Sequence, residues 1–147
     1  MNQDDDFLRR LFEEVPVGLF KTKRSDGLIQ LINPFGAKLL GFNDPSEVEG
    51  KYHATDFYPK RIRKKLIEKL EKDGLVSDFE IELKTINGDR IWVSATATNG
   101  DDRMIGSLTD ITERKRLESE LDDVKAHMCE VMKNIEEHAK QRLSDIV

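Results

Sequence analysis

The sequence has few of the residues that build metal centres and disulfide frameworks. Its one cysteine is Cys129, and its three histidines, His53, His127 and His138, are not spaced as metal ligands. A disulfide within one chain needs a second cysteine, and a four-cysteine zinc site needs three more. We therefore expect neither a disulfide nor a metal site in this chain.

Long apolar runs are also missing. No stretch approaches the roughly 18 apolar residues of a membrane-spanning helix, and Asp4, Asp5 and Asp6 stand where a secretory signal would be basic. The 147 residues include 24 Lys and Arg against 29 Asp and Glu, for a formal net charge of −5. This balance is typical of one solvated domain with a modest core. It predicts a cytoplasmic chain without membrane insertion.

Hydrophobic periodicity divides the chain into three parts. A helical repeat predicts an amphipathic helix within residues 1–16, and a second helical pattern, free of glycine and proline, runs over 113–147. Between them, residues 17–112 form a core of short elements. We predict strands over 18–23, 28–32, 76–86, 90–98 and 103–111, and helices over 34–40, 45–50 and 59–72. The fold class is therefore α+β.

A short motif at the end of the last strand is the most specific in the chain: Asp110-Ile111-Thr112-Glu113-Arg114-Lys115. Supporting motifs occupy 17–20, 33–37, 40–42 and 87–93. Over residues 7–116 the chain thus resembles a PAS domain followed by a signalling helix, as in sensor histidine kinases. The resemblance implies a five-stranded antiparallel sheet in the order 2-1-5-4-3, with inserted helices that enclose a small cavity.

The walls of such a cavity are predicted from strand alternation. Phe79 and Ile81 share one face of their strand, and two alanines on the next strand leave room beside them. Our candidate ligand-binding residues are Leu39, Phe42, Tyr52, Phe57, Leu66, Phe79, Ile81, Val93, Ala95 and Ala97. A small apolar ligand is one interpretation, and an ordinary filled core is the other.

The resemblance also bears on cofactors. Light-sensing relatives need a cysteine beside a flavin, and Cys129 lies far along the last helix, so a covalent flavin is not expected. Haem-binding relatives use a histidine on the long inserted helix, and residues 59–72 contain none, so haem is not expected either. A noncovalent flavin has no short signature. The identity of any cofactor, and whether there is one, stays open.

The junction between the last strand and the last helix has no flexible spacer. Asp110 and Glu113 have the spacing of a capping box, and Thr112 can bond near the start of the helix. A shift of the strand must therefore move the helix. By resemblance, Asp110, Thr112 and Arg114 are the residues that relay a signal from core to output helix.

The last helix carries an apolar seam with alternating steps of four and three residues, the spacing of a coiled coil. The seam consists of Leu117, Leu121, Val124, Met128, Val131 and Ile135. We expect it to form a parallel homodimer, with further contacts from the N-terminal helix. His138 continues the seam, but the residues after it depart from the phosphoacceptor motif of sensor kinases. Any role of His138 stays open.

The basic run Lys60–Lys65 suggests a nucleic-acid patch as an alternative. On a helix these residues spread around the side opposite Ile62 and Leu66, and no aromatic residues interleave, so we favour a solvated face and expect no nucleic-acid partner.

The predicted function is a noncatalytic sensory and dimerisation module of a multidomain signalling protein, most often a histidine kinase. Modules of cyclic-di-GMP enzymes and of transcription regulators are the alternatives. We expect any catalytic domain to lie outside these residues.

Overall fold

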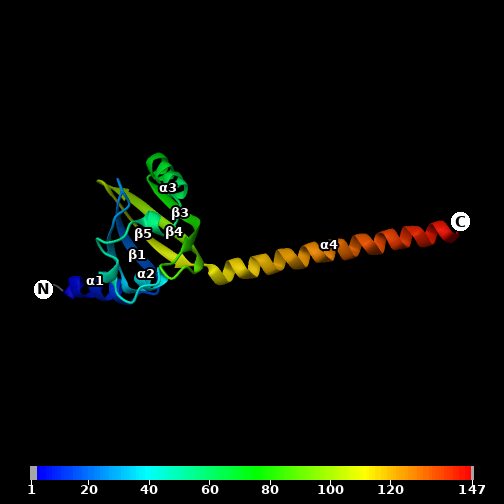
Figure 1. Ribbon diagram of the computed structural model, residues 1–147, viewed down its shortest axis with the longest axis horizontal. Coiled ribbons are helices and arrows are strands. Elements are labelled where there is room, and N and C mark those ends of the chain that lie inside the picture. Colours follow the sequence, from blue (N-terminus) through cyan, green and yellow to red (C-terminus); the bar gives the residue numbers. More distant parts are fainter. Residues whose placement is uncertain (1–2, 147) are drawn as a thin grey trace. The chain divides into compact units, whose positions relative to one another are not determined.

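The computed structural model describes residues 3–146 and divides into two compact units, one that ends at Thr112 and one that begins at Glu113. The first unit contains α1 (Gln3–Glu14), β1 (Gly18–Lys23), β2 (Ile29–Ile32), α2 (Pro34–Leu39), the 3-10 helices η1 (Pro45–Glu47) and η2 (Ala54–Asp56), α3 (Lys60–Asp73), β3 (Leu75–Lys84), β4 (Arg90–Gly100) and β5 (Arg103–Asp110) (Figure 1). The helix α4 (Thr112–Ile146) begins at the last residue of the first unit and makes up the second. The ends of the two predicted terminal helices, residues 1–2 and 147, lie outside the described residues.

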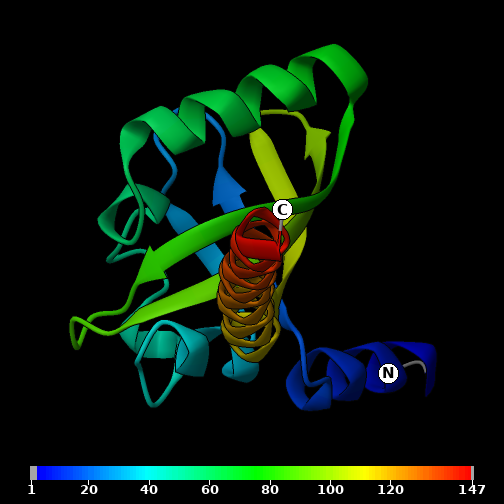
Figure 2. The ribbon, with the colours of Figure 1, turned by 90° about the vertical axis from the view of Figure 1, so that its right-hand side faces the viewer.

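The five strands form one antiparallel sheet in the order β2-β1-β5-β4-β3. The strand order implied by the resemblance and the α+β class predicted from periodicity are both confirmed. In Figure 2 the long helix α3 is the green helix beside the strands. Two bulges interrupt the ladders, one between Lys21 and Thr22 on the β1–β2 side and one between Val76 and Phe79 on the β3–β4 side. Asp78, inside the second bulge, has a φ of 53°, in the left-handed region.

Local chemistry explains where the inserted helices begin and end. The Asn33 side chain caps α2 by accepting a hydrogen bond from the Gly36 amide, and Pro34 fits the first helical position. Gly74, with a φ of 73°, ends α3 in a left-handed cap. The helix predicted over 45–50 is wrong in extent: only the 3-10 turn η1 forms there. The η2 turn was not predicted at all.

The core consists of two clusters of buried residues in the first unit. The larger contains Ile29, Ile32, Ala37, Leu40, Phe42, Val48, Phe57, Ile81, Leu83, Val93 and Ala95. The smaller contains Leu66, Leu70, Val76, Ala97 and Met104. Apolar residues of α3 therefore pack on β3, β4 and β5, where alternation turns one set of strand residues toward the helices.

A single buried amide joins α1 to this core. Asn33 is fully buried, and its Nδ2 donates to the carbonyl oxygens of Phe12 (3.1 Å) and Val17 (2.8 Å). Its Oδ1 accepts from the amides of Leu19 (2.8 Å) and Gly36 (2.9 Å). All the donors and the acceptor of this side chain are thus used, and the end of α1, the start of β1 and the start of α2 meet at one residue.

Candidate functional site: a small cavity and a strand-to-helix joint

A cavity of about 50 Å³ lies inside the first unit. Its walls are Phe20, Thr22, Ile29, Ile32, Leu40, Ala54, Phe57, Tyr58, Leu66, Ile81, Leu83, Ala95, Met104 and Leu108. These residues come from the sheet, from η2 and from α2 and α3 with their flanks. All are apolar except Thr22 and Tyr58, so the cavity favours an apolar occupant with few polar groups.

The predicted ligand-binding residues fall into two groups in the structure. Phe57, Leu66, Ile81 and Ala95 border the cavity. The other six, Leu39, Phe42, Tyr52, Phe79, Val93 and Ala97, are not among its walls. The periodicity of strands and helices identifies the face on which a residue lies. Whether that residue reaches the cavity also depends on its position along the element, which periodicity does not give.

Aromatic packing explains two of the residues that do not border the cavity. The ring centroids of Phe42 and Tyr52 are 5.0 Å apart, and those of Tyr52 and Phe57 are 5.9 Å apart. Phe42 and Phe57 meet edge to face at 6.2 Å. The three rings therefore pack against one another, and only Phe57 also contributes to the cavity wall.

The remaining four have neighbours elsewhere in the first unit. Leu39 is half-buried and lies next to Gly18. The ring of Phe79 lies 5.0 Å below the Lys69 ammonium. Val93 and Ala97 are buried, one in each core cluster. Val93, Ala97 and Phe79 therefore pack in or against the core, and none of the four borders the cavity.

Sequence reasoning missed both polar wall residues of the cavity, Tyr58 and the more deeply buried Thr22. Its side chain is 3% exposed, and its Oγ1 has no hydrogen-bond partner among the residues that the structure describes. On the sheet Thr22 pairs with Ile29 of β2 and Met104 of β5. Its alternation with Phe20 is the signal that places it on the inner face.

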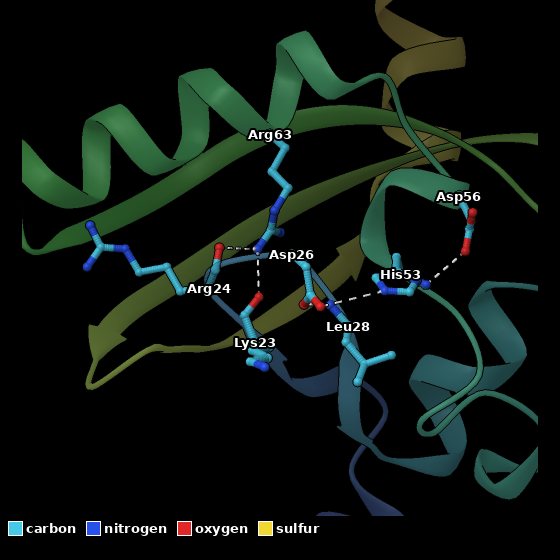
Figure 3. Close-up of polar contacts among 7 residues, drawn as sticks. All are labelled: Lys23, Arg24, Asp26, Leu28, His53, Asp56 and Arg63. Carbon is cyan, nitrogen blue, oxygen red and sulfur yellow. Dashed lines mark hydrogen bonds and ion pairs between the residues drawn. The ribbon is translucent and has the colours of Figure 1, made fainter.

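A buried arginine, Arg63, lies next to the cavity residue Tyr58. Arg63 is 5% exposed, and its Nη2 donates to the carbonyl oxygens of Lys23 (3.0 Å) and Arg24 (3.3 Å). Figure 3 shows this side chain reaching from α3 to the end of β1. Its Nη1 lies 3.5 Å from the Tyr58 hydroxyl. Burial raises the pKa of Tyr58, and the nearby guanidinium opposes that shift.

The position of Arg63 corrects one sequence interpretation. We assigned the basic run Lys60–Lys65 to a solvated face, and the structure buries its fourth residue. Arg63 precedes Leu66 by three residues and Leu70 by seven, so it belongs to the apolar stripe of α3. Its guanidinium group donates to two backbone carbonyl oxygens inside the protein and does not face the solvent.

A second polar cluster lies at the turn between β1 and β2. The Asp26 carboxylate accepts a hydrogen bond from the Leu28 amide at 3.0 Å and lies 3.9 Å from Nε2 of His53 (Figure 3). The amide of His53 in turn donates to Asp56 at 2.8 Å. The Leu28 bond is the main reason that the pKa of Asp26 lies below its ordinary value, with Lys23 and His53 adding to the effect.

The described side chains of residues 3–144 contain no group of three or more His, Cys, Asp or Glu that could hold a metal ion. Among the described residues, 3–146, no helix has the length and apolar character needed to cross a membrane.

The joint between sheet and last helix is built on the backbone of Trp92 in β4. The Trp92 amide donates to Oγ1 of Thr112 at 3.0 Å, and that hydroxyl lies 3.4 Å from the Trp92 carbonyl oxygen, to which it donates. The Ile111 amide donates to the same carbonyl at 2.8 Å. Asp110 accepts from the Thr112 amide at 2.9 Å. The first residue of α4 is thus fixed to an inner strand.

The capping box expected at this joint is wrong. The helix begins at Thr112, so Asp110 stands one residue outside the N-cap position. Glu113 bonds to Arg116 within α4 instead of reaching back, and this bond lowers the pKa of Glu113. Asp110 and Thr112, two of the predicted relay residues, meet at the joint. The third, Arg114, forms an ion pair with Glu118 at 3.6 Å.

The predicted dimer residues are all exposed on α4. Their exposed fractions run from 41% for Val131 to 64% for Ile135. On α1, Phe7 and Leu8 are likewise exposed, at 65% and 60%. Apolar side chains of this size in regular rows are typical of surfaces that another chain covers.

The comparisons with known proteins agree with this architecture. A family model described as PAS domain matches residues 16–113, which is most of the first unit. The chain belongs to the PAS domain family. No curated protein matches the chain. As a PAS sensory domain, it shares its sheet order and inserted helices with many solved structures.

Three of these PAS structures illustrate the likeness. A sensory box histidine kinase/response regulator from Burkholderia thailandensis E264 has a TM-score of 0.65 and 21% identity, covering 83% of this chain and 96% of its own. The PAS domain of an HTR-like protein from Haloarcula marismortui has a TM-score of 0.61 and 24% identity, covering 76% and 100%. A PAS domain from a LuxR-family transcriptional regulator of Burkholderia thailandensis, in complex with ethanol, has a TM-score of 0.62 and 18% identity, covering 70% and 96%. At these identities the likeness shows the fold.

Proposed function

We propose that this PAS domain is the sensory and dimerisation module of a multidomain signalling protein, of the histidine kinase type. The state of its core is relayed through Asp110, Thr112 and Arg114 into a parallel coiled coil of two copies. The observation that carries this proposal is the pair of hydrogen bonds between the Thr112 hydroxyl and the Trp92 backbone, one accepted from the amide and one donated to the carbonyl oxygen. The module itself performs no catalysis, and the output domain belongs to the rest of such a protein.

The joint supports a relay because two hydrogen bonds hold Thr112, the residue at which α4 begins, to the strand β4. β4 carries Ala95, a cavity wall, three residues after Trp92, the anchor of Thr112. A change of packing at the cavity therefore acts on the same strand that holds the start of α4. Because rigid elements transmit displacement only when they are firmly attached, the hydroxyl of Thr112 is the point at which the relay can be broken.

The seam on α4 supports the dimer. A helix of this length cannot bury its apolar stripe on itself, and the stripe has the four–three spacing that two parallel helices cover. Glu120 and Lys125 occupy positions that would pair across such a dimer. A second copy of the chain is therefore the partner that this stripe fits.

The input is a small apolar ligand in the cavity. The ethanol complex of a similar PAS domain is a property of that protein. For this chain the support is the cavity itself, with its apolar walls and its position beside β4.

The relay can be tested with a spin label on Cys129, the only cysteine, which is exposed on α4. The distance between the two labels of a dimer reports the arrangement of the coiled coil. We expect Ala95→Val, which changes packing at the cavity, to shift that distance distribution. The same substitution in a Thr112→Val background should leave the distribution unmoved.

Thr112→Ser is the matched control, because it keeps the hydroxyl that Thr112→Val removes. We expect the response to Ala95→Val to survive in Thr112→Ser. Faster hydrogen exchange of the Trp92 amide in Thr112→Val alone would show that the joint has opened. An equal response to Ala95→Val in all three backgrounds would overturn the relay.

A further inference from the structure

The apolar positions of α4 change their spacing part-way along the helix. Up to Ile135 they follow the seven-residue repeat of the predicted seam in two rows: Leu117, Val124 and Val131, and Leu121, Met128 and Ile135. The next positions of these rows are His138 and Arg142, which are polar. A parallel dimer that kept this repeat would bury two copies of Arg142 against each other, and a buried charge without an opposite partner is unfavourable. The seven-residue repeat therefore provides no apolar surface beyond Ile135.

A second repeat, of eleven residues, begins inside the first. Each of its steps joins two apolar residues: Met128 and Ala139, Met132 and Leu143, and Ile135 and Ile146. Met128 and Ile135 belong to both repeats, so the two overlap over residues 128–135. Met132 and Leu143, which lie outside the predicted seam, are 65% and 64% exposed, as much as Ile135 at 64%. The apolar surface of α4 therefore continues beyond Ile135, on a shifted face.

The helix itself is unbroken across this change. Every residue from 112 to 146 is α-helical, and no π-turn within that range takes up extra residues locally. Figure 1 shows α4 as one continuous helix. The change of spacing is therefore a change in which side of one helix is apolar. Consecutive residues of an α-helix lie about 100° apart around its axis, so His138 and Ala139 do not both face one partner.

We propose that α4 binds a second copy of the chain through the two repeats in turn, with Ala139 and Leu143 inside the interface and His138 outside it. This interface rests on the proposed function, because the partner is the other copy of the parallel dimer. The overlap of the two repeats selects that partner. A copy that covers Met128 and Ile135 lies against the face on which Ala139 and Leu143 follow, since α4 is continuous.

The two repeats favour different twists of the helix pair. Seven residues fall about 20° short of two full turns of an α-helix, so two helices with a seven-residue seam wind to the left. Eleven residues, at roughly 3.67 per turn, slightly exceed three full turns, so an eleven-residue seam favours the opposite twist. The left-handed supercoil of the pair therefore unwinds where the spacing changes, within residues 128–135.

Disulfide cross-linking of single cysteines along α4 of the full chain tests this interface. The background is Cys129→Ser, which removes the native thiol, and the decisive pair is Ala139→Cys and His138→Cys. In a parallel dimer each residue of the seam faces its own copy, whereas residues off the seam point apart and cannot be bridged without backbone movement. We expect Ala139→Cys to form a covalent dimer under mild oxidation and His138→Cys to stay a single chain on a denaturing gel.

Two controls bracket this pair. Leu121→Cys lies in the seven-residue seam and should cross-link. The wild type should not, because Cys129 follows Met128 by one residue and lies off both seams. A second measurement is thermal unfolding of the dimer. We expect Leu143→Gln to lower the melting temperature, because it places an amide in the interface, and the neighbouring Arg142→Gln to leave it nearly unchanged.

The outcomes separate this interface from the dimer itself. If Leu121→Cys and His138→Cys cross-link and Ala139→Cys does not, the seven-residue repeat continues, and the inference is overturned while the dimer stands. Cross-linking of Leu121→Cys alone, or of all three variants alike, also overturns the inference and leaves the dimer standing. If none of the three cross-links, the parallel dimer of the proposed function is overturned as well.

Discussion

The unit that ends at Thr112 and the helix α4 differ in how far their apolar side chains are buried. The first unit closes two clusters around residues such as Leu70 and Val93, which are fully buried. The helix leaves Leu121 and Met128 more than half exposed, at 53% and 57%. The first unit carries its own stabilising core, whereas the stability of α4 depends on what covers its stripe.

The difference indicates a division of labour within one chain. A domain with a closed core can change its internal packing without losing its fold. A helix that needs a partner is sensitive to small changes in register, because a coiled coil allows only certain alignments of its seam. Under the proposed relay, a modest change in the first unit would therefore have a large effect at α4.

The largest effect is expected when the apolar stripe of α4 is made polar. We expect the double variant Leu121→Glu and Met128→Glu to lose the coiled-coil dimer, because buried like charges would face each other in the seam. Light scattering should show the mass of the particle halved. Ala126→Glu, on the outer side of the predicted seam, is the control and should remain a dimer. An unchanged mass in the double variant would contradict the coiled coil.

The second prediction concerns the stability of the first unit, which we expect to depend strongly on Asn33. Asn33→Asp removes the two N–H donors that bond to Phe12 and Val17 and places a carboxylate where no solvent reaches. We expect a loss of about 3–5 kcal/mol in the free energy of unfolding, measured by urea denaturation. The exposed Asn43→Asp should change it by less than about 0.5 kcal/mol. Equal losses in the two variants would mean that the buried network contributes nothing.

A smaller effect is expected at the attachment of α3 to β1. Arg63→Met removes the hydrogen bonds to the carbonyl oxygens of Lys23 and Arg24 while keeping an apolar stem on the helix stripe. We expect a loss of about 2 kcal/mol, since each acceptor is left without this donor. The control is Arg61→Met, on the exposed side of the same helix. Thermal unfolding of both variants decides whether burial of Arg63 stabilises the unit.

The smallest effect concerns pH. The folded state lowers the pKa of Asp26 from its ordinary value of 3.8, chiefly through the Leu28 amide. Its contribution to stability is therefore complete above pH 3.8 and is lost as the pH falls through the lowered pKa. Asp26→Asn removes this dependence, so we expect its stability to fall less than that of the wild type between about pH 5 and about pH 2. Parallel acid titrations of the two proteins would contradict this account.

The sequence predicts the order of elements well because each boundary has local chemistry. Asn33-Pro34 marks the start of α2, Gly74 the end of α3, and strand alternation the inner face of β3 and β4. The motif over 110–115 then identifies the fold by resemblance. The strand order could be stated only from that resemblance, because pairing between β1 and β5 joins residues that are far apart in the chain.

The candidate site was harder to predict because its decisive features are contacts. The alternation of Thr22 with Phe20 shows that the hydroxyl faces inward, but that it has no partner follows only from the folded chain. Arg63 lies in the apolar stripe of α3, three residues before Leu66, and the basic residues around it hid this signal. The capping role of Asn33 is visible in sequence, whereas its bonds to Phe12 and Val17 depend on how α1 meets the core.

The bulge at Asp78 bears on whether another chain can add a strand to this sheet. β3 is an edge strand, and an edge with regular unpaired amides is a template on which another chain can add a strand. The left-handed turn of Asp78 interrupts that regularity, and charged Glu80 and Lys84 follow it along the strand. The opposite edge, β2, is only four residues long. Both borders of the sheet therefore discourage the addition of a strand from another chain.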